Sequence, residues 1–393
     1  MPLCTGSDFA GAMKSGLPLT RRLLPEVLVE PAGVLGAVLA CFAVPVVSFE
    51  DEEEDEPHPA STPSAAIAAR VAGLLMPGPC HIRAPTLAAS MPTRHLLTGT
   101  ELSPAELGGL LDRAEELAAA PLSSRALQGR SVALIFEKPS TRTRVSFEVG
   151  IDELGGHAVV LRPDELQLSR GEALRDTALV LSRHVAAIGL RTGPDEALEE
   201  LARWSTVPVI NMLSARHHPC QALADLLTLR HARGGLQGLR LAYVGDGNNV
   251  ARSLALLGSL AGLDVAIASP PGYALETDIA PPPGASGRIS LHTDPREAVA
   301  GASAVYTDVW VSMGDEATAQ ERRRDLAAYR VDDALLDAAG PDAFAMHDLP
   351  AHPGEEITPE VLYGSRQHIW DQAENRRHAQ KALLELLIGP APR

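Results

Sequence analysis

Hydroxyl and guanidinium side chains gather at one predicted strand-to-helix junction, where the sequence first suggests chemistry. Directly after the β-rich run 131–136 come Ser140, Thr141, Arg142, Thr143 and Arg144. Free backbone N–H groups and the helix dipole favour anions at the start of a helix. Arginine adds paired hydrogen bonds to phosphate. The pattern therefore predicts an anion site, and the alternative is a solvated basic helix start with hydroxyl caps.

A second polar group opens the apolar segment at 222–229. His218 and Gln221 are three positions apart, so they share a face if this turn is helical. Both are candidates for binding or catalysis, and the alternative is that His218 only caps the helix. Cys220, which lies between them, is expected to be packed rather than reactive.

Three more motifs follow β-rich runs in the second half of the chain. The segment GDGNN (245–249) lacks the third glycine of a dinucleotide fingerprint and the Gly-Lys-Ser/Thr of a P-loop, so it predicts only a crevice at a strand end. Asp308 closes a strand and could pair with an ammonium group; the alternative is an Asx turn. Asp348, in MHDLPAHPGEE, is a ligand for a cationic substrate, a general base or a turn residue, and the residues alone leave this open.

These motifs need an α/β scaffold to bring them together. About four β-rich runs precede the linker near residue 234 and about five follow it, alternating with helical stretches. Such alternation predicts two α/β domains, each a doubly wound parallel sheet covered on both faces, with an active-site cleft between them. A final helix, roughly 371–387, is expected to pack back across the domains.

Composition narrows the classes of function. The 393 residues carry a formal charge of −16, of which seven negatives lie in the run 50–56, and basic residues are not in excess. We therefore expect no nucleic-acid partner. The four cysteines form no Cys-x-x-Cys pair, so neither a disulfide framework nor a zinc site is expected, and a reducing cytoplasm fits best.

Residues 1–90 differ from the rest of the chain. Their uncharged run 33–49 is short for a transmembrane helix and is followed by acids rather than by a cleavage site. A disordered or non-native extension is the prediction, and no membrane association is expected. A membrane or export role and a partner-binding segment are the alternatives.

Taken in order, the motifs resemble the aspartate/ornithine carbamoyltransferase family, most closely its ornithine-specific members. The resemblance runs from about Met91 to the C-terminus and is carried by STRTR, HPCQ, GDGNN, DVWVSMG, LPAH and AENRRHAQKALL. It implies transfer of the carbamoyl group of carbamoyl phosphate to the side-chain amine of L-ornithine, without metal or cofactor, in a cytoplasmic homotrimer. Residues 91–233, completed by 371–393, would bind carbamoyl phosphate, and 234–370 would bind ornithine.

The resemblance also assigns site residues. The carbamoyl phosphate site would comprise Ser140, Thr141, Arg142, Thr143, Gln167, Arg191, His218, Gln221 and Arg376. The ornithine site would comprise Asn249, Asp308, Ser312, Met313, Asp348 and Leu349. The catalytic residues implied are Arg142, Arg191, His218, Asp348 and Arg376.

One position departs from the family pattern. The family typically has His-Cys-Leu-Pro where this chain has His347, Asp348, Leu349 and Pro350. An ionised Asp348 would favour the ammonium form of the acceptor, whereas a desolvated one could serve as a base. The alternatives are an ornithine enzyme that tolerates or uses Asp348, a carbamoyltransferase for a different amine, and a non-catalytic relative.

Overall fold

The computed structural model describes residues 93–167, 171–312, 314 and 316–389. The predicted extension 1–90 and Met313 lie outside the described residues. None of the helices in the described part combines the length and the apolar content that a membrane crossing requires.

The first sheet has four parallel strands in the order β2-β1-β3-β4. Its strands are β1 (Ser131–Phe136), β2 (His157–Leu161), β3 (Ala187–Arg191) and β4 (Val209–Leu213). The helices of this half are α1 (Pro104–Ala119), α2 (Thr141–Glu153), α3 (Leu174–Leu181), α4 (Asp195–Trp204) and α5 (Pro219–Arg233), with a 3-10 turn η1 (Pro163–Glu165). Apolar residues fill both faces of β1, because Leu134 and Ile135 pack into different core clusters.

The second sheet has five parallel strands in the order β7-β6-β5-β8-β9. Its strands are β5 (Arg240–Val244), β6 (Asp264–Ala268), β7 (Arg288–His292), β8 (Ala304–Thr307) and β9 (Phe344–His347). Its helices and turns are α6 (Asn249–Leu260), α7 (Pro295–Val299), η3 (Glu316–Thr318), α8 (Ala319–Leu326), η4 (Ala327–Tyr329), α9 (Asp333–Ala339) and α10 (Pro359–Leu362), and they are followed by the last described helix, α11 (Ile369–Ile388). The predicted architecture of two parallel α/β sheets is confirmed.

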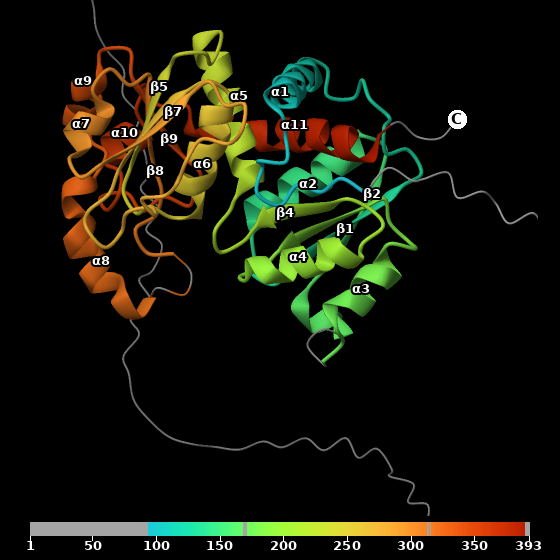
Figure 1. Ribbon diagram of the computed structural model, residues 1–393. Helices are drawn as coiled ribbons and strands as arrows, with labels where there is room; N and C mark the ends of the chain where they lie inside the picture. Colours follow the sequence, from blue (N-terminus) through green and yellow to red (C-terminus); the bar gives the residue numbers. More distant parts are fainter. Residues whose placement is uncertain (1–92, 168–170, 313, 315, 390–393) are drawn as a thin grey trace, which may run out of the picture. The chain divides into compact units, whose positions relative to one another are not determined.

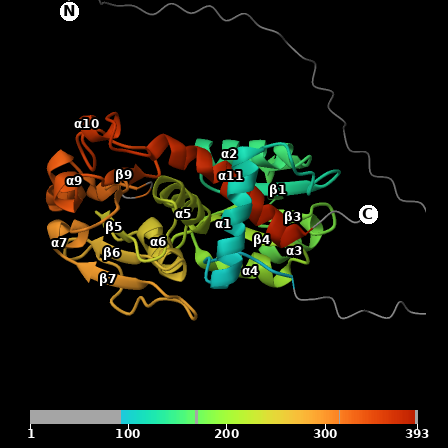
Figure 2. The ribbon, with the colours of Figure 1, turned by 90° about the horizontal axis from the view of Figure 1, so that it is seen from above.

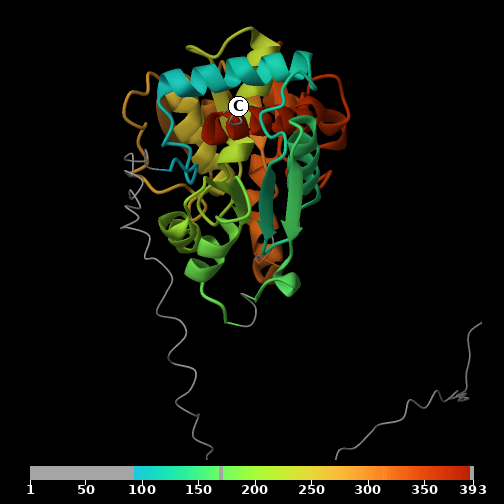
Figure 3. The ribbon, with the colours of Figure 1, turned by 90° about the vertical axis from the view of Figure 1, so that its right-hand side faces the viewer.

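Helix α11 joins the two halves. It begins beside β9 and packs against α5, α2 and α1 (Figure 1). Figures 2 and 3 show that α1 and α11 cover the same face of the first sheet, with α11 between α1 and the strands. The C-terminal helix therefore completes the layer that began with α1, although the whole second sheet separates the two in the chain.

A buried ion pair anchors α11 in this layer. The Lys381 side chain is fully buried and donates hydrogen bonds to the carboxylate of Glu153 in α2 and to the carbonyl oxygen of Pro121, the latter at 3.1 Å.

Breaking the buried pair of Lys381 and Glu153 would leave an uncompensated charge. We expect Lys381→Ala to lower the free energy of unfolding by about 3–5 kcal/mol, measured by urea denaturation. The double variant Lys381→Met with Glu153→Gln should recover part of this loss, and a loss below about 1 kcal/mol in the single variant would contradict the prediction.

Candidate active site

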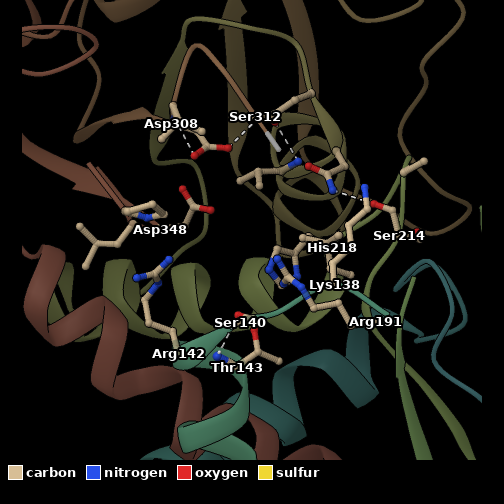
Figure 4. Close-up of a pocket in the computed structure, with 18 of the residues that line it drawn as sticks. Lys138, Ser140, Arg142, Thr143, Arg191, Ser214, His218, Asp308, Ser312 and Asp348 are labelled. Carbon is tan, nitrogen blue, oxygen red and sulfur yellow. Dashed lines mark hydrogen bonds between the residues drawn. The ribbon is translucent and has the colours of Figure 1, made fainter. Parts of the chain in front are cut away.

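A cleft of about 790 Å³ opens at the carboxyl ends of strands from both sheets. Parallel sheets bind ligands at this edge, because strand ends and helix starts meet there. Figure 4 shows cationic and hydroxyl side chains of the first half facing carboxylates of the second half across the cleft. Twelve of the predicted site residues line it: Ser140, Thr141, Arg142, Thr143, Arg191, His218, Asn249, Asp308, Ser312, Asp348, Leu349 and Arg376.

The start of α2 forms the anion-binding end of the cleft. Ser140 is the N-cap residue, and its Oγ accepts a hydrogen bond from the backbone N–H of Thr143 at 3.4 Å. The first turn contains no acidic residue, so its N–H dipoles are unopposed by a local negative charge. Arg142 extends from this turn into the cleft (Figure 4). This end of the cleft has the charge and hydrogen-bond donors that a phosphate requires.

Three buried side chains form the opposite wall of this anion site. Arg191 ends β3, His218 precedes α5 and Arg376 comes from α11; all three are less than a tenth exposed. Within the described residues, Nε of Arg191, Nε of Arg376 and Nδ1 of His218 are buried without a hydrogen-bond partner. Buried polar atoms are normally paired, so these atoms indicate that a polar ligand belongs here.

The electrostatic environment keeps this wall cationic but its histidine neutral. Burial, followed by the charges of Arg376 and Arg191, holds the pKa of His218 well below its ordinary value. Burial and the neighbouring Arg376 also lower the pKa of Arg191 to about 10, so it stays charged at neutral pH. An anionic ligand would relieve the repulsion between these arginines, and a neutral imidazole can donate one hydrogen bond to a carbonyl oxygen.

Arg376 is held from two elements of the first half. Its Nη2 donates to Oγ1 of Thr143 at 2.7 Å, and its Nη1 donates to Oε1 of Gln221. Gln221 does not line the cleft; it is buried behind Arg376, and its Nε2 donates to Oδ1 of Asp225 at 2.8 Å. The structure thus gives Gln221 contacts with an arginine of the cleft rather than a position on its wall.

Asp225 links this network to the second half. Its Oδ1 also accepts a hydrogen bond from Nε2 of Gln372 at 2.7 Å, and Gln372 Oε1 accepts from the backbone N–H of His347 at 2.9 Å. Burial raises the pKa of Asp225 to about 7, against the lowering effect of its hydrogen bonds. Asp225 therefore takes up a proton near neutral pH. Its hydrogen bonds connect Gln221, which holds Arg376, with Gln372, which holds the start of the loop after β9.

This shift predicts a pH-dependent stability. The folded state binds an extra proton between pH ~4 and pH ~7, so the free energy of unfolding falls as pH rises through that window. Asparagine cannot titrate. From pH 5 to pH 7.5 the free energy of unfolding of the wild type should therefore fall by about 2 kcal/mol relative to that of Asp225→Asn. Urea denaturation at several pH values measures this, with Asp152→Asn on the exposed surface of α2 as the control. A difference that stays constant with pH would contradict the prediction.

The second half contributes amides and carboxylates. Asn248 is the N-cap of α6, and its Nδ2 donates to Oδ2 of Asp308 at 2.7 Å. The next residue, Asn249, donates from Nδ2 to the carbonyl oxygen of Ser214 at 2.7 Å. Ser312 lines the cleft beyond Asp308. These groups can hold the ammonium and carboxylate of an amino acid.

The loop after β9 places Asp348 and Leu349 at the cleft. Its shape depends on His347, which is fully buried: Nδ1 accepts from the backbone N–H of Leu349 at 2.8 Å, and Nε2 lies 3.1 Å from Oε1 of buried Glu356. Since Nδ1 accepts a hydrogen bond, the proton of a neutral His347 lies on Nε2 and points to Glu356. Leu349 has φ 63°, a conformation that is strained for leucine and needs such support.

Two predicted site residues, Gln221 and Gln167, do not line the cleft, and some residues that line it were not predicted. Gln167 is exposed and does not line the cleft of its own chain. Lys138, Asn248, Arg322 and His352 line the cleft but were not predicted as site residues. The lysine next to the hydroxyl-rich motif and the first of two adjacent asparagines were visible in the sequence. Cys220 is packed as predicted, since it is fully buried and burial raises the pKa of its thiol to about 12.

Two family models match the described chain, one in each half. Residues 94–231 match the family model of the aspartate/ornithine carbamoyltransferase carbamoyl-P binding domain, and residues 237–387 match that of the Asp/Orn binding domain. An ornithine carbamoyltransferase of Acidothermus cellulolyticus is 54% identical over 310 residues, which are 76% of this chain and 97% of that relative. An anabolic ornithine carbamoyltransferase of Pyrococcus furiosus is 50% identical over 270 residues, which are 67% of this chain and 86% of the relative.

Solved structures show the same similarity. An ornithine carbamoyltransferase structure from Pyrococcus furiosus has a TM-score of 0.72 at 45% identity, covering 76% of this chain and 98% of that one. The corresponding structure from Thermus thermophilus has a TM-score of 0.67 at 45% identity, covering 75% and 98%.

Proposed function

Because this chain belongs to the aspartate/ornithine carbamoyltransferase family, we propose that it transfers the carbamoyl group of carbamoyl phosphate to the side-chain amine of L-ornithine. The products are L-citrulline and phosphate, in a step of arginine biosynthesis. The observation that carries the proposal is one cleft with carboxylates on one wall and, on the other, buried arginine and histidine side chains that each have one nitrogen without a hydrogen-bond partner among the described residues.

Carbamoyl phosphate binds in the half formed by residues 91–233 and completed by α11. The start of α2 holds the phosphate through Ser140, Thr141, Arg142 and Thr143, and the guanidinium groups of Arg191 and Arg376 add charge. His218 donates a hydrogen bond to the carbonyl oxygen. Gln221 acts indirectly, because it orients Arg376.

Ornithine binds in the half formed by residues 234–370. Asn249 and Ser312 bind the α-carbon groups together with Asp308, and Asp348 and Leu349 lie at the side-chain amine. Met313 belongs to the same loop as Ser312 and is included in this proposal by its place in the sequence.

The reaction needs a neutral amine beside the carbonyl carbon. Donors aimed at the carbonyl oxygen stabilise the negative charge that develops on attack, and the arginines stabilise the departing phosphate. When both substrates are held in one cleft, the entropy of bringing them together is lost on binding and no longer adds to the barrier of the chemical step. The difficult requirement is deprotonation, since an amine of this kind has a pKa of about 10.4.

A homotrimer in the cytoplasm is the proposed working form. Gln167 is exposed and does not line the cleft of its own chain, so in a trimer its place would be at the cleft of a second copy. Sedimentation of the protein at micromolar concentration tests the trimer, and a monomer with full activity would contradict it.

The test of the proposed function is citrulline formation from ornithine and carbamoyl phosphate, alongside a panel of other amines and the variant Asp348→Cys. Citrulline from the wild type supports the proposal. No citrulline from the wild type, with citrulline from the variant, would contradict it. Carbamoylation of a different amine by the wild type would show that Asp348 selects another acceptor.

A further inference from the structure

Two carboxylates meet at the carboxyl edge of the second sheet because of strand register. Strands β8 and β9 are parallel neighbours, and their last paired residues are Thr307 and His347. Asp308 and Asp348 each directly follow one of these residues, so they lie at the same edge of the sheet. Ligand atoms of Asp308, His347 and Asp348 lie within 4.8 Å of one another. Figure 4 shows Asp348 between Asp308 and Arg142 at the cleft.

The two carboxylates differ in their hydrogen bonds. Asp308 accepts at Oδ2 from Nδ2 of Asn248 and at Oδ1 from the backbone N–H of Val309, each at 2.7 Å. Both oxygens of Asp308 therefore already accept a hydrogen bond. Oδ1 of Asp348 is buried and has no hydrogen-bond partner within the described residues. Asp308 is therefore the carboxylate held in place by donors, and Asp348 is the one with an oxygen that can still accept a proton.

His347 does not neutralise Asp348, although its Nδ1 lies 3.6 Å from Oδ1. That nitrogen accepts the backbone N–H of Leu349, and the other ring nitrogen faces Glu356. Both ring nitrogens are engaged, so His347 offers neither a proton to Asp348 nor a lone pair to a metal. The pair of carboxylates is left facing the cleft.

The groups facing Asp348 come from several elements. They are Asp308 after β8, Asp225 in α5, Arg191 in β3, Arg376 in α11, Tyr243 in β5, Tyr306 in β8 and Arg142 in α2. Burial, followed by repulsion from Asp308, raises the pKa of Asp348 well above its ordinary value. A raised pKa makes a carboxylate a better proton acceptor for an amine.

We propose that Asp348 is the proton acceptor for the attacking amine, and that Asp308 strengthens it as a base by lying beside it as a fixed anion. The proposal rests on the proposed carbamoyl transfer. In the empty cleft the proton lies on Asp348, whose Oδ1 has no other partner among the described residues. The side-chain ammonium group of the arriving substrate takes the place of that proton beside Asp348, and the proton leaves to solvent.

The chemical step then balances as follows. One proton moves from the ammonium nitrogen to an Oδ atom of Asp348, and the freed electron pair forms the N–C bond with the carbamoyl carbon. The C–O bond to phosphate breaks, and its electron pair leaves with the phosphate. The phosphate takes the second proton from the nitrogen, and Asp348 later releases its proton to solvent.

The variant Asp348→Asn tests this proposal, because it keeps the shape of the side chain but cannot accept the proton. We expect kcat/KM for ornithine to fall by about 10²–10⁴-fold at pH 7.5. The variant must bind the free amine, whose concentration rises about tenfold per pH unit below its pKa of about 10.4, so the loss should shrink toward pH 10. A merely structural role would give a loss that does not change with pH.

Controls separate the base from the fold and from the overall reaction. Asp342→Asn, at the exposed opposite end of β9, should stay within about twofold of the wild type. L-norvaline has the carbon chain and the α-amine of ornithine but lacks the side-chain amine. It should still inhibit Asp348→Asn, which would show that the site is folded. A loss below about threefold at pH 7.5, or one constant from pH 7 to 10, would overturn the role of Asp348. Absence of citrulline from the wild type would instead contradict the proposed function.

Discussion

Replacing Arg142 by methionine is expected to lower kcat/KM for carbamoyl phosphate by about 10³-fold. Arg142 extends from the first turn of α2 into the cleft, where helix N–H groups already favour an anion. Methionine keeps much of the side-chain volume but removes the guanidinium that holds the phosphate as it departs. Because inorganic phosphate uses the same donors, its inhibition constant should rise in the same variant.

The same motif provides a matched control. Arg144 lies two residues further along α2, is 46% exposed and pairs with Glu148 at 3.0 Å on the helix surface. An exposed pair of this kind contributes less than about 1 kcal/mol. Arg144→Met should therefore keep nearly full activity. Equal losses in the two variants would show that the whole basic motif acts through its net charge rather than through Arg142.

Replacing His218 by glutamine is expected to lower kcat by about 10²–10³-fold, the usual effect of removing a donor from a developing oxyanion. Burial and two neighbouring arginines keep this imidazole neutral, so the loss should be the same at pH 6.5 and pH 8.5. Steady-state kinetics at both pH values measures it. A loss that disappears above pH 7 would mean that His218 acts as a cation.

The neighbouring histidine is the control for this variant. His217 precedes His218 directly but does not line the cleft. His217→Gln should retain kcat within about threefold, since it removes no group that faces the substrates. The pair of variants separates a hydrogen bond to the reacting carbonyl from a general effect on the start of α5.

Local patterns in the sequence were sufficient to predict most of the fold. The run 131–136 is apolar after Ser131 and forms a strand buried on both faces, as is typical of parallel sheets. The final helix was expected near 371–387 and is observed at Ile369–Ile388. The cleft could also be predicted, because motifs at strand ends meet at one edge of a parallel sheet.

Contacts between distant segments could not be predicted in this way. The hydrogen bond between Arg376 and Thr143 joins residues 233 positions apart, and no local pattern encodes it. Gln221 faces α11 rather than the cleft because Arg376 arrives there from the other end of the chain. The register that pairs Thr307 with His347 likewise depends on how two strands align that are separated by two α-helices and two 3-10 turns.

The position of α11 also bears on how this protein is made. The first sheet and α1, α2 and α5 leave the ribosome early, yet Arg376 and the helix that covers them follow only after the entire second sheet. Domains generally fold in the order of synthesis, but here the earlier half stays uncovered until the later half has been translated. A nascent chain therefore cannot complete its anion site before α11 has left the ribosome, and cutting the gene at residue 233 would give a first half without Arg376 and without the helix that covers α1, α2 and α5.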